Sequence, residues 1–197
     1  MTMQVTMEVA MKMGTFRVLE KPSFCAKSRQ VPGKTVIESL LMAAETPFQV
    51  ILHQRRVAEV VLKIGELCTW HIPVDLELLV AAAQLHDILR TQPDHARKGA
   101  AFLTRNGFPD VAKVVEGHMD LPSQASMETK ILYLADKYVN GMEIVSLRER
   151  EELVRQSFPS GGKALENALR RIKMAFEIER LVEKITGEYC GPAFKIG

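Results

Sequence analysis

The feature that most constrains this fold is a set of ionisable residues that lie within apolar helical patterns. His53 is followed at helical spacing by Val57, Val60 and Ile64, so its side chain points where theirs point. Imidazoles and carboxylates are costly to bury unless something binds them. A shared cation is therefore the predicted reason for the pattern. The residues concerned are His53, His86, Asp87, His95, His118 and Asp136.

From residue 35 onward the apolar residues recur with helical period, which predicts an all-α body. The last predicted helix carries a long apolar stripe, which either packs against its own domain or forms a homodimer interface. We expect residues 35–197 to form one helical body with a C-terminal helical extension. The predicted helices cover residues 36–44, 49–67, 76–89, 93–107, 109–118, 126–141, 146–159 and 164–185.

The first 34 residues follow a different pattern and form a separate N-terminal segment of strand and linker. Residues 2–13 alternate polar and apolar side chains, and Gly14 interrupts them before residues 15–19. This alternation is typical of a short β-hairpin, although a disordered leader is the other reading. Residues 20–34 contain prolines, a glycine and polar residues, as linkers do.

Composition excludes several classes of protein. The chain has 197 residues, 47% of them hydrophobic, and a net charge of +2 with the basic residues spread out. A dedicated nucleic-acid binder would show a dense basic stripe. No apolar run approaches the roughly 20 residues that span a membrane, and we find no secretory signal. Three scattered cysteines, without a CxxC pair, favour the reducing cytoplasm.

The types of residue in the set indicate which cation would fit. A lone histidine on an apolar face is more often a core residue with a private hydrogen bond. The whole set argues otherwise, because Asp87 directly follows His86 and Asp136 lies in the apolar run ILYLAD. Imidazole nitrogen with carboxylate oxygen suits a divalent transition metal such as zinc, iron, manganese, nickel or cobalt.

These residues carry a resemblance to a known family. The order H…HD…D, in the stretches LHQRRVAEVV, AAAQLHDILR and ILYLADKYVNG, resembles the HD-domain superfamily of metal-dependent phosphohydrolases, over residues 48–142. The resemblance implies an HD-domain helical bundle with one or two metal ions. His53, His86, Asp87 and Asp136 would hold the first. His95 and His118 would hold a second, with Asp87 bridging.

Within the superfamily, the extra histidines resemble the subgroup of HD-type diadenosine tetraphosphate hydrolases. The cyclic-dinucleotide phosphodiesterases of the HD-GYP type are also similar, but the GYP tripeptide and its downstream segment are absent here. We therefore expect a phosphohydrolase that cleaves a phosphoester or phosphoanhydride of a nucleotide by a metal-activated hydroxide. The alternatives are a cyclic-dinucleotide phosphodiesterase and a non-catalytic metal-binding sensor or scaffold.

Basic residues close to the ligands in sequence are candidates for substrate binding. Positive side chains there would neutralise charge that develops on a phosphoryl group, and Asp87 would orient the attacking hydroxide. Arg90 is the candidate for catalysis as well as binding. Each basic residue has a simpler reading as a surface charge, and Asn140 as a helix end. The candidates for substrate binding are Arg56, Arg90, Lys137 and Asn140.

Overall fold

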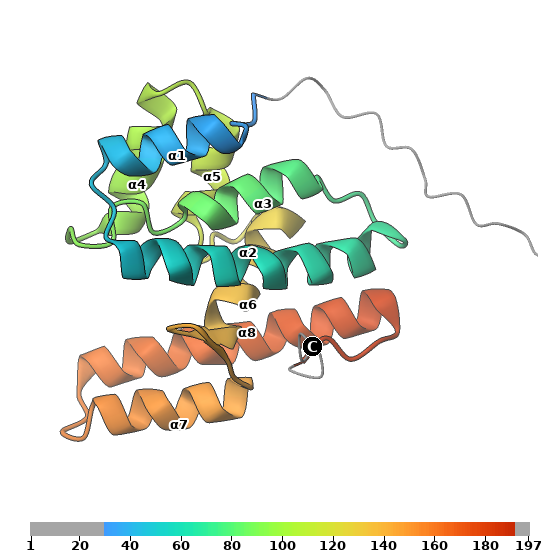
Figure 1. Ribbon diagram of the computed structural model, residues 1–197. Coiled ribbons are helices and arrows are strands. Elements are labelled where there is room, and N and C mark those ends of the chain that lie inside the picture. Colours follow the sequence, from blue (N-terminus) through green and yellow to red (C-terminus); the bar gives the residue numbers. More distant parts are fainter. Residues whose placement is uncertain (1–29, 192–197) are drawn as a thin grey trace, which may run out of the picture.

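Helices account for nearly all regular structure in the computed structural model, which describes residues 30–191 (Figure 1). This confirms the prediction of an all-α fold, while the predicted hairpin within residues 2–19 lies outside the described residues. Two short strands, joined by a two-residue turn, form a small antiparallel ribbon in which Val139 lies opposite Ile144. The elements are α1 (Lys34–Ala43), α2 (Phe48–Thr69), α3 (Leu76–Leu85), α4 (His95–Arg105), α5 (Pro109–Glu116), α6 (Met127–Tyr138), β1 (Val139–Asn140), β2 (Glu143–Ile144), α7 (Leu147–Ser157) and α8 (Lys163–Thr186).

Helix α6 is the centre of the bundle. It contacts α2, α3 and α5 on one side and α7 and α8 on the other, and Figure 1 shows it between α2 and α8. The run from Ile131 to Ala135 is buried almost completely, so α6 is apolar around its whole circumference. Ser126 caps its first turn by accepting the backbone N–H of Thr129. A helix enclosed in this way fixes whatever side chains it carries.

The C-terminal hairpin of α7 and α8 packs onto α6 (Figure 1). Two tyrosines of α6 reach across: the Tyr133 hydroxyl donates to the backbone oxygen of Arg171 at 3.0 Å, and the Tyr138 hydroxyl donates to Glu179 at 2.5 Å. The apolar stripe of α8, including Ile178, is buried against its own chain. The homodimer therefore stays a prediction. None of the described helices is long and apolar enough to cross a membrane.

The predicted helix over residues 76–89 is too long, because α3 ends at Leu85. The His86 ring takes a backbone acceptor that the helix would otherwise use: its Nδ1 lies 2.8 Å from the carbonyl oxygen of Ala83. Gln54 of α2, with its amide oxygen facing the turn, accepts the next two backbone N–H groups, at 3.1 and 3.2 Å. Side chains thus replace the hydrogen bonds that would have continued the helix.

Helix α7 depends on a capping box for its first turn. The Ser146 hydroxyl accepts the backbone N–H of Glu149 at 3.1 Å, and the Glu149 carboxylate accepts the backbone N–H of Ser146 at 2.7 Å. We expect Ser146→Ala to lower the free energy of unfolding by about 1 kcal/mol, measured by urea denaturation. Ser157→Ala is the matched control, since Ser157 is exposed at the other end of α7. An equal loss in both variants would contradict this role.

Candidate metal centre

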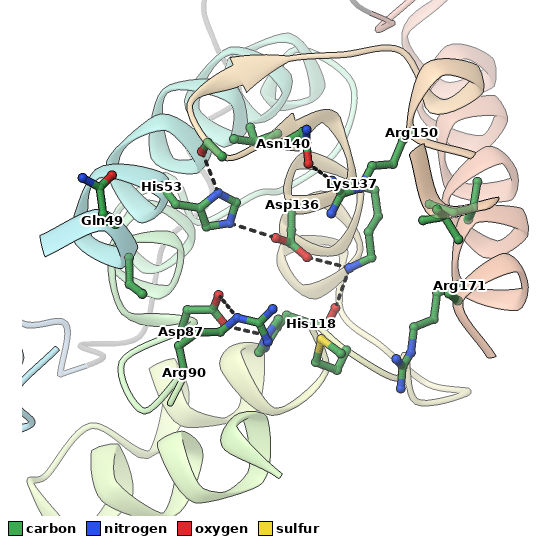
Figure 2. A pocket seen from close by; sticks show the side chains of 17 residues that line it. Gln49, His53, Asp87, Arg90, His118, Asp136, Lys137, Asn140, Arg150 and Arg171 are labelled. Carbon is green, nitrogen blue, oxygen red and sulfur yellow. Dashed lines mark hydrogen bonds and ion pairs between the residues drawn. The ribbon is translucent and has the colours of Figure 1, made fainter. Parts of the chain in front are cut away.

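The six predicted ligands converge on one place. They come from α2, from the turns that follow α3 and α5, from the first residue of α4, and from α6. Around Asp136, the Nε2 atoms of His53 and His86 lie 3.2 and 3.6 Å from Oδ1. Figure 2 shows His53 and Asp136 pointing toward each other at the wall of a cavity. This half of the cluster joins α2 to α6.

Asp87 organises the other half of the cluster. Its Oδ1 lies 3.1 Å from Nε2 of His95 and 3.4 Å from Nε2 of His118, and its Oδ2 lies 3.7 Å from Nε2 of His86. The ring centroids of His86 and His118 are 5.0 Å apart. His86 thus faces both carboxylates, and the two halves form one continuous group.

Three of the histidines are oriented in the same way: Nδ1 of each ring forms a hydrogen bond with a backbone carbonyl. A carbonyl only accepts, so each Nδ1 carries a proton. In the neutral ring, which is the form that binds a metal, Nε2 then keeps its lone pair for the centre of the cluster. Histidines that bind metals commonly have such a partner on the other nitrogen. The acceptors are the carbonyls of Gly141, Ala83 and Val115, which lie 3.0, 2.8 and 2.6 Å from Nδ1 of His53, His86 and His118 respectively.

The local placement of three of these residues differs from the sequence prediction, which put every ligand on the apolar face of a helix. His86 is the C-cap of α3, Asp87 lies in the following turn, and His118 follows the C-cap of α5. At His86 and His118 the ring accounts for the difference, because it bonds the carbonyl three residues earlier at the helix end.

Several ligand atoms are buried without a hydrogen-bond partner among the described residues. They are Nε2 of His86, Nε2 of His118 and Oδ1 of Asp87. Unpaired buried polar atoms are rare and call for an explanation. The donor atoms also form two groups whose members lie within 4.8 Å of one another: His53, His86 and Asp136, and His86, Asp87 and His118. Nitrogen and oxygen donors at such separations fit a divalent transition metal.

Both carboxylates are held in the ionised form that a metal ligand requires. Burial by itself would raise the pKa of Asp87, but the charge of His86 and the contacts with His118 and His95 hold that pKa well below its ordinary value. At Asp136, burial again opposes ionisation. The neighbouring Lys137 ammonium, 2.6 Å from Oδ2, and the contact with His53 lower the pKa of Asp136 far below its ordinary value.

A cavity of about 510 Å³ opens beside the cluster (Figure 2). Of the predicted substrate-binding residues, Arg90, Lys137 and Asn140 line it. Arg90 also lies 3.3 Å from Oδ2 of Asp87 through its Nε. Arg56 is not among the lining residues, because its guanidinium turns along α2 to Glu59, at 2.7 Å. The structure therefore separates Arg56 from the other candidates.

Sequence reasoning missed part of the cavity wall. Arg150 of α7 and Arg171 of α8 line the cavity, together with Gln49 and Met119. The apolar stripe of α8 predicts only a packing or dimerisation helix. Arg150 and Arg171 follow the recognisable HD stretches, and no local motif marks them. Only the way the hairpin packs against α6 brings them to the site.

One of three comparisons with known proteins agrees with this geometry. The family model of the HD domain matches residues 50–141. The chain is also similar to a tRNA (cytidine(56)-2'-O)-methyltransferase of Picrophilus torridus, with 27% identity over 141 residues. That match covers 61% of this chain and 40% of the methyltransferase. No solved structure matches the chain at a significant level.

Metal content tests the site directly. We expect protein purified without chelator to retain a divalent transition metal at one or both of the ligand groups. Loss of an outer-shell partner of a metal ligand typically weakens metal binding by about 10- to 100-fold. Loss of a ligand itself, in His118→Ala, should weaken metal binding by at least as much. His71→Ala is the matched control, because His71 is exposed outside the cluster. Elemental analysis of both variants gives the stoichiometry, and equal metal loss in both would contradict the assignment.

Proposed function

We propose that the chain is a metal-dependent phosphohydrolase that cleaves a phosphoester or phosphoanhydride bond of a nucleotide. The proposal starts from the match of residues 50–141 to the HD domain. The observation that carries the proposal is the set of buried Nε2 and Oδ1 atoms that lack a hydrogen bond within residues 30–191, beside a cavity with cationic walls. Phosphate compounds are anionic, and such walls favour their binding. The match to a methyltransferase carries no activity over to this chain, because it covers 40% of that protein.

His53, His86, Asp87, His95, His118 and Asp136 would hold the metal. A divalent ion bound there would supply Lewis acidity, which polarises the phosphoryl group and activates water. Asp87 contributes by contacting three histidines at once. It therefore sets the spacing between the two halves of the cluster.

The chain's own cations would stabilise negative charge on the substrate. Lys137 is buried, pairs with Asp136 and also donates to the backbone oxygen of His118, at 3.3 Å. These contacts hold its ammonium group at the cavity wall, where it would compensate charge on phosphoryl oxygens. Arg90 lies at the mouth, half exposed, and would reach the substrate from the opposite side of Asp87.

A panel of phosphate donors separates this proposal from the alternatives. The purified protein is tested with manganese, iron, cobalt, nickel and zinc against nucleoside mono- and triphosphates, diadenosine tetraphosphate and a cyclic dinucleotide. We expect metal-dependent release of phosphate or nucleotide from the linear compounds. Turnover of the cyclic dinucleotide alone would favour a phosphodiesterase. Turnover of no compound, with metal demonstrably bound, would favour a sensor or scaffold.

Arg90 provides a test at the level of one residue. Arg90→Gln removes a cation that lies 3.3 Å from Asp87 and 3.4 Å from His95, and it replaces none of the predicted metal ligands. We expect kcat/KM for the best donor to fall by about 10- to 100-fold, the usual worth of a hydrogen bond to a charged group. Arg97→Gln is the control, because Arg97 is exposed and its one ion-pair partner among residues 30–191 is Asp94. Unchanged kinetics in Arg90→Gln would remove Arg90 from the substrate-binding residues.

A further inference from the structure

Two arginines from outside the matched HD domain face the same cavity. We propose that the α7–α8 hairpin selects the substrate, and that Arg150 and Arg171 bind a second anionic group of it, apart from the phosphoryl group at the histidine and aspartate cluster. The inference rests on the proposed function and deepens it. It predicts that the preferred substrates carry at least two anionic groups, as nucleoside di- and triphosphates do.

The charge of Arg150 is uncompensated by any carboxylate among the described residues. Its Nη1 donates to the side-chain oxygen of Asn140, which is neutral. Its Nε is buried and has no hydrogen-bond partner in the described part of the chain. A guanidinium that lines a cavity, spends one donor on a neutral amide and pairs with no carboxylate of the described residues is suited to an anionic ligand.

Arg171 also keeps positive charge available. Its Nε and Nη2 contact the two oxygens of Asp120 at 3.2 and 2.8 Å. Arg170 shares the same carboxylate, at 2.9 Å. Two guanidinium groups against one carboxylate leave one positive charge on this edge of the cavity. The bidentate contact holds the Arg171 side chain in place, which lowers the entropy cost of binding a ligand.

Both arginines lie on a wall opposite the α2 residues. Figure 2 shows Gln49 and His53 on one side of the cavity and Arg150 and Arg171 on the other, with Lys137 between. A substrate held at the cluster by one phosphoryl group would extend toward this wall.

The wall also offers apolar surface for the rest of the ligand. Val154 of α7 and Ala168 and Ile172 of α8 line the cavity together with the two arginines. Such a mixture of apolar surface and a few fixed polar groups is typical of small-molecule sites. A compound with one phosphate would occupy the cluster and leave Arg150 and Arg171 unused, which predicts weaker binding.

The test compares substrates of different charge in Arg150→Gln and Arg171→Gln. We expect KM for adenosine triphosphate to rise by about 10- to 100-fold in each variant. KM for p-nitrophenyl phosphate, which has a single phosphate, should stay within about twofold. The controls are Arg155→Gln and Arg180→Gln, exposed residues of the same helices. They should change neither substrate's KM.

A loss of folding in the variants would not produce the expected difference between the two substrates. Of the two tyrosine hydrogen bonds that tie α8 to α6, one uses the backbone oxygen of Arg171 and the other uses Glu179, so Arg171→Gln leaves both intact. Equal losses on both substrates, or no loss on adenosine triphosphate, would overturn the proposal. Thermal unfolding of each variant confirms that the fold is retained.

A binding measurement separates this inference from the proposed function. If no donor is hydrolysed, calorimetry with inorganic tripolyphosphate and inorganic phosphate still tests whether Arg150 and Arg171 bind a second anionic group. Tighter binding of tripolyphosphate by the unaltered protein, lost in Arg150→Gln and Arg171→Gln, supports the inference even where hydrolysis fails. Equal binding of the two anions, or a preference that both variants retain, overturns it.

Discussion

The hydrogen bond from a histidine Nδ1 to a backbone carbonyl is the interaction on which the cluster depends. At His86 and His118 it occurs at the end of a helix and points Nε2 inward. The same bond at His53 uses the carbonyl of Gly141 in the turn between β1 and β2. Each of these rings is thus oriented by a backbone carbonyl on Nδ1, which directs Nε2 toward the two carboxylates of the cluster.

Helix α6 connects the cluster to the rest of the chain. It carries Asp136 and Lys137 directly after the apolar run of residues 131–135, where both side chains are largely shielded from solvent. They compensate each other and the neighbouring imidazoles instead. On its other side, Tyr133 and Tyr138 attach α8. The same helix therefore positions Asp136 and the α7–α8 hairpin, so that the cavity has walls from both parts of the chain.

Local signals in the sequence were sufficient for most of the fold. Ser126 and Ser146 begin helices as N-caps, and Asp75 caps α3 as expected. Two helices were predicted too long. Helix α6 stops at Tyr138, before strand β1, although the prediction ran to residue 141. At the end of α3, an apolar, helix-favouring run continues to residue 89 but the helix stops at Leu85. Its termination depends on Gln54, more than thirty residues earlier in the chain, which takes over backbone N–H groups of the turn. No local pattern contains that information.

The sequence by itself determined the helical body and the identity of the six convergent residues, because burying imidazoles and carboxylates leaves a pattern that helical spacing reveals. Only the tertiary structure decided which cations reach the cavity. Arg56, close to His53 in sequence, turns to Glu59, whereas Arg150 and Arg171 arrive from a hairpin beyond the HD domain. The physical reason is that a long, charged side chain carries no periodic signal, and its direction is set by the nearest available partner after the helices have packed.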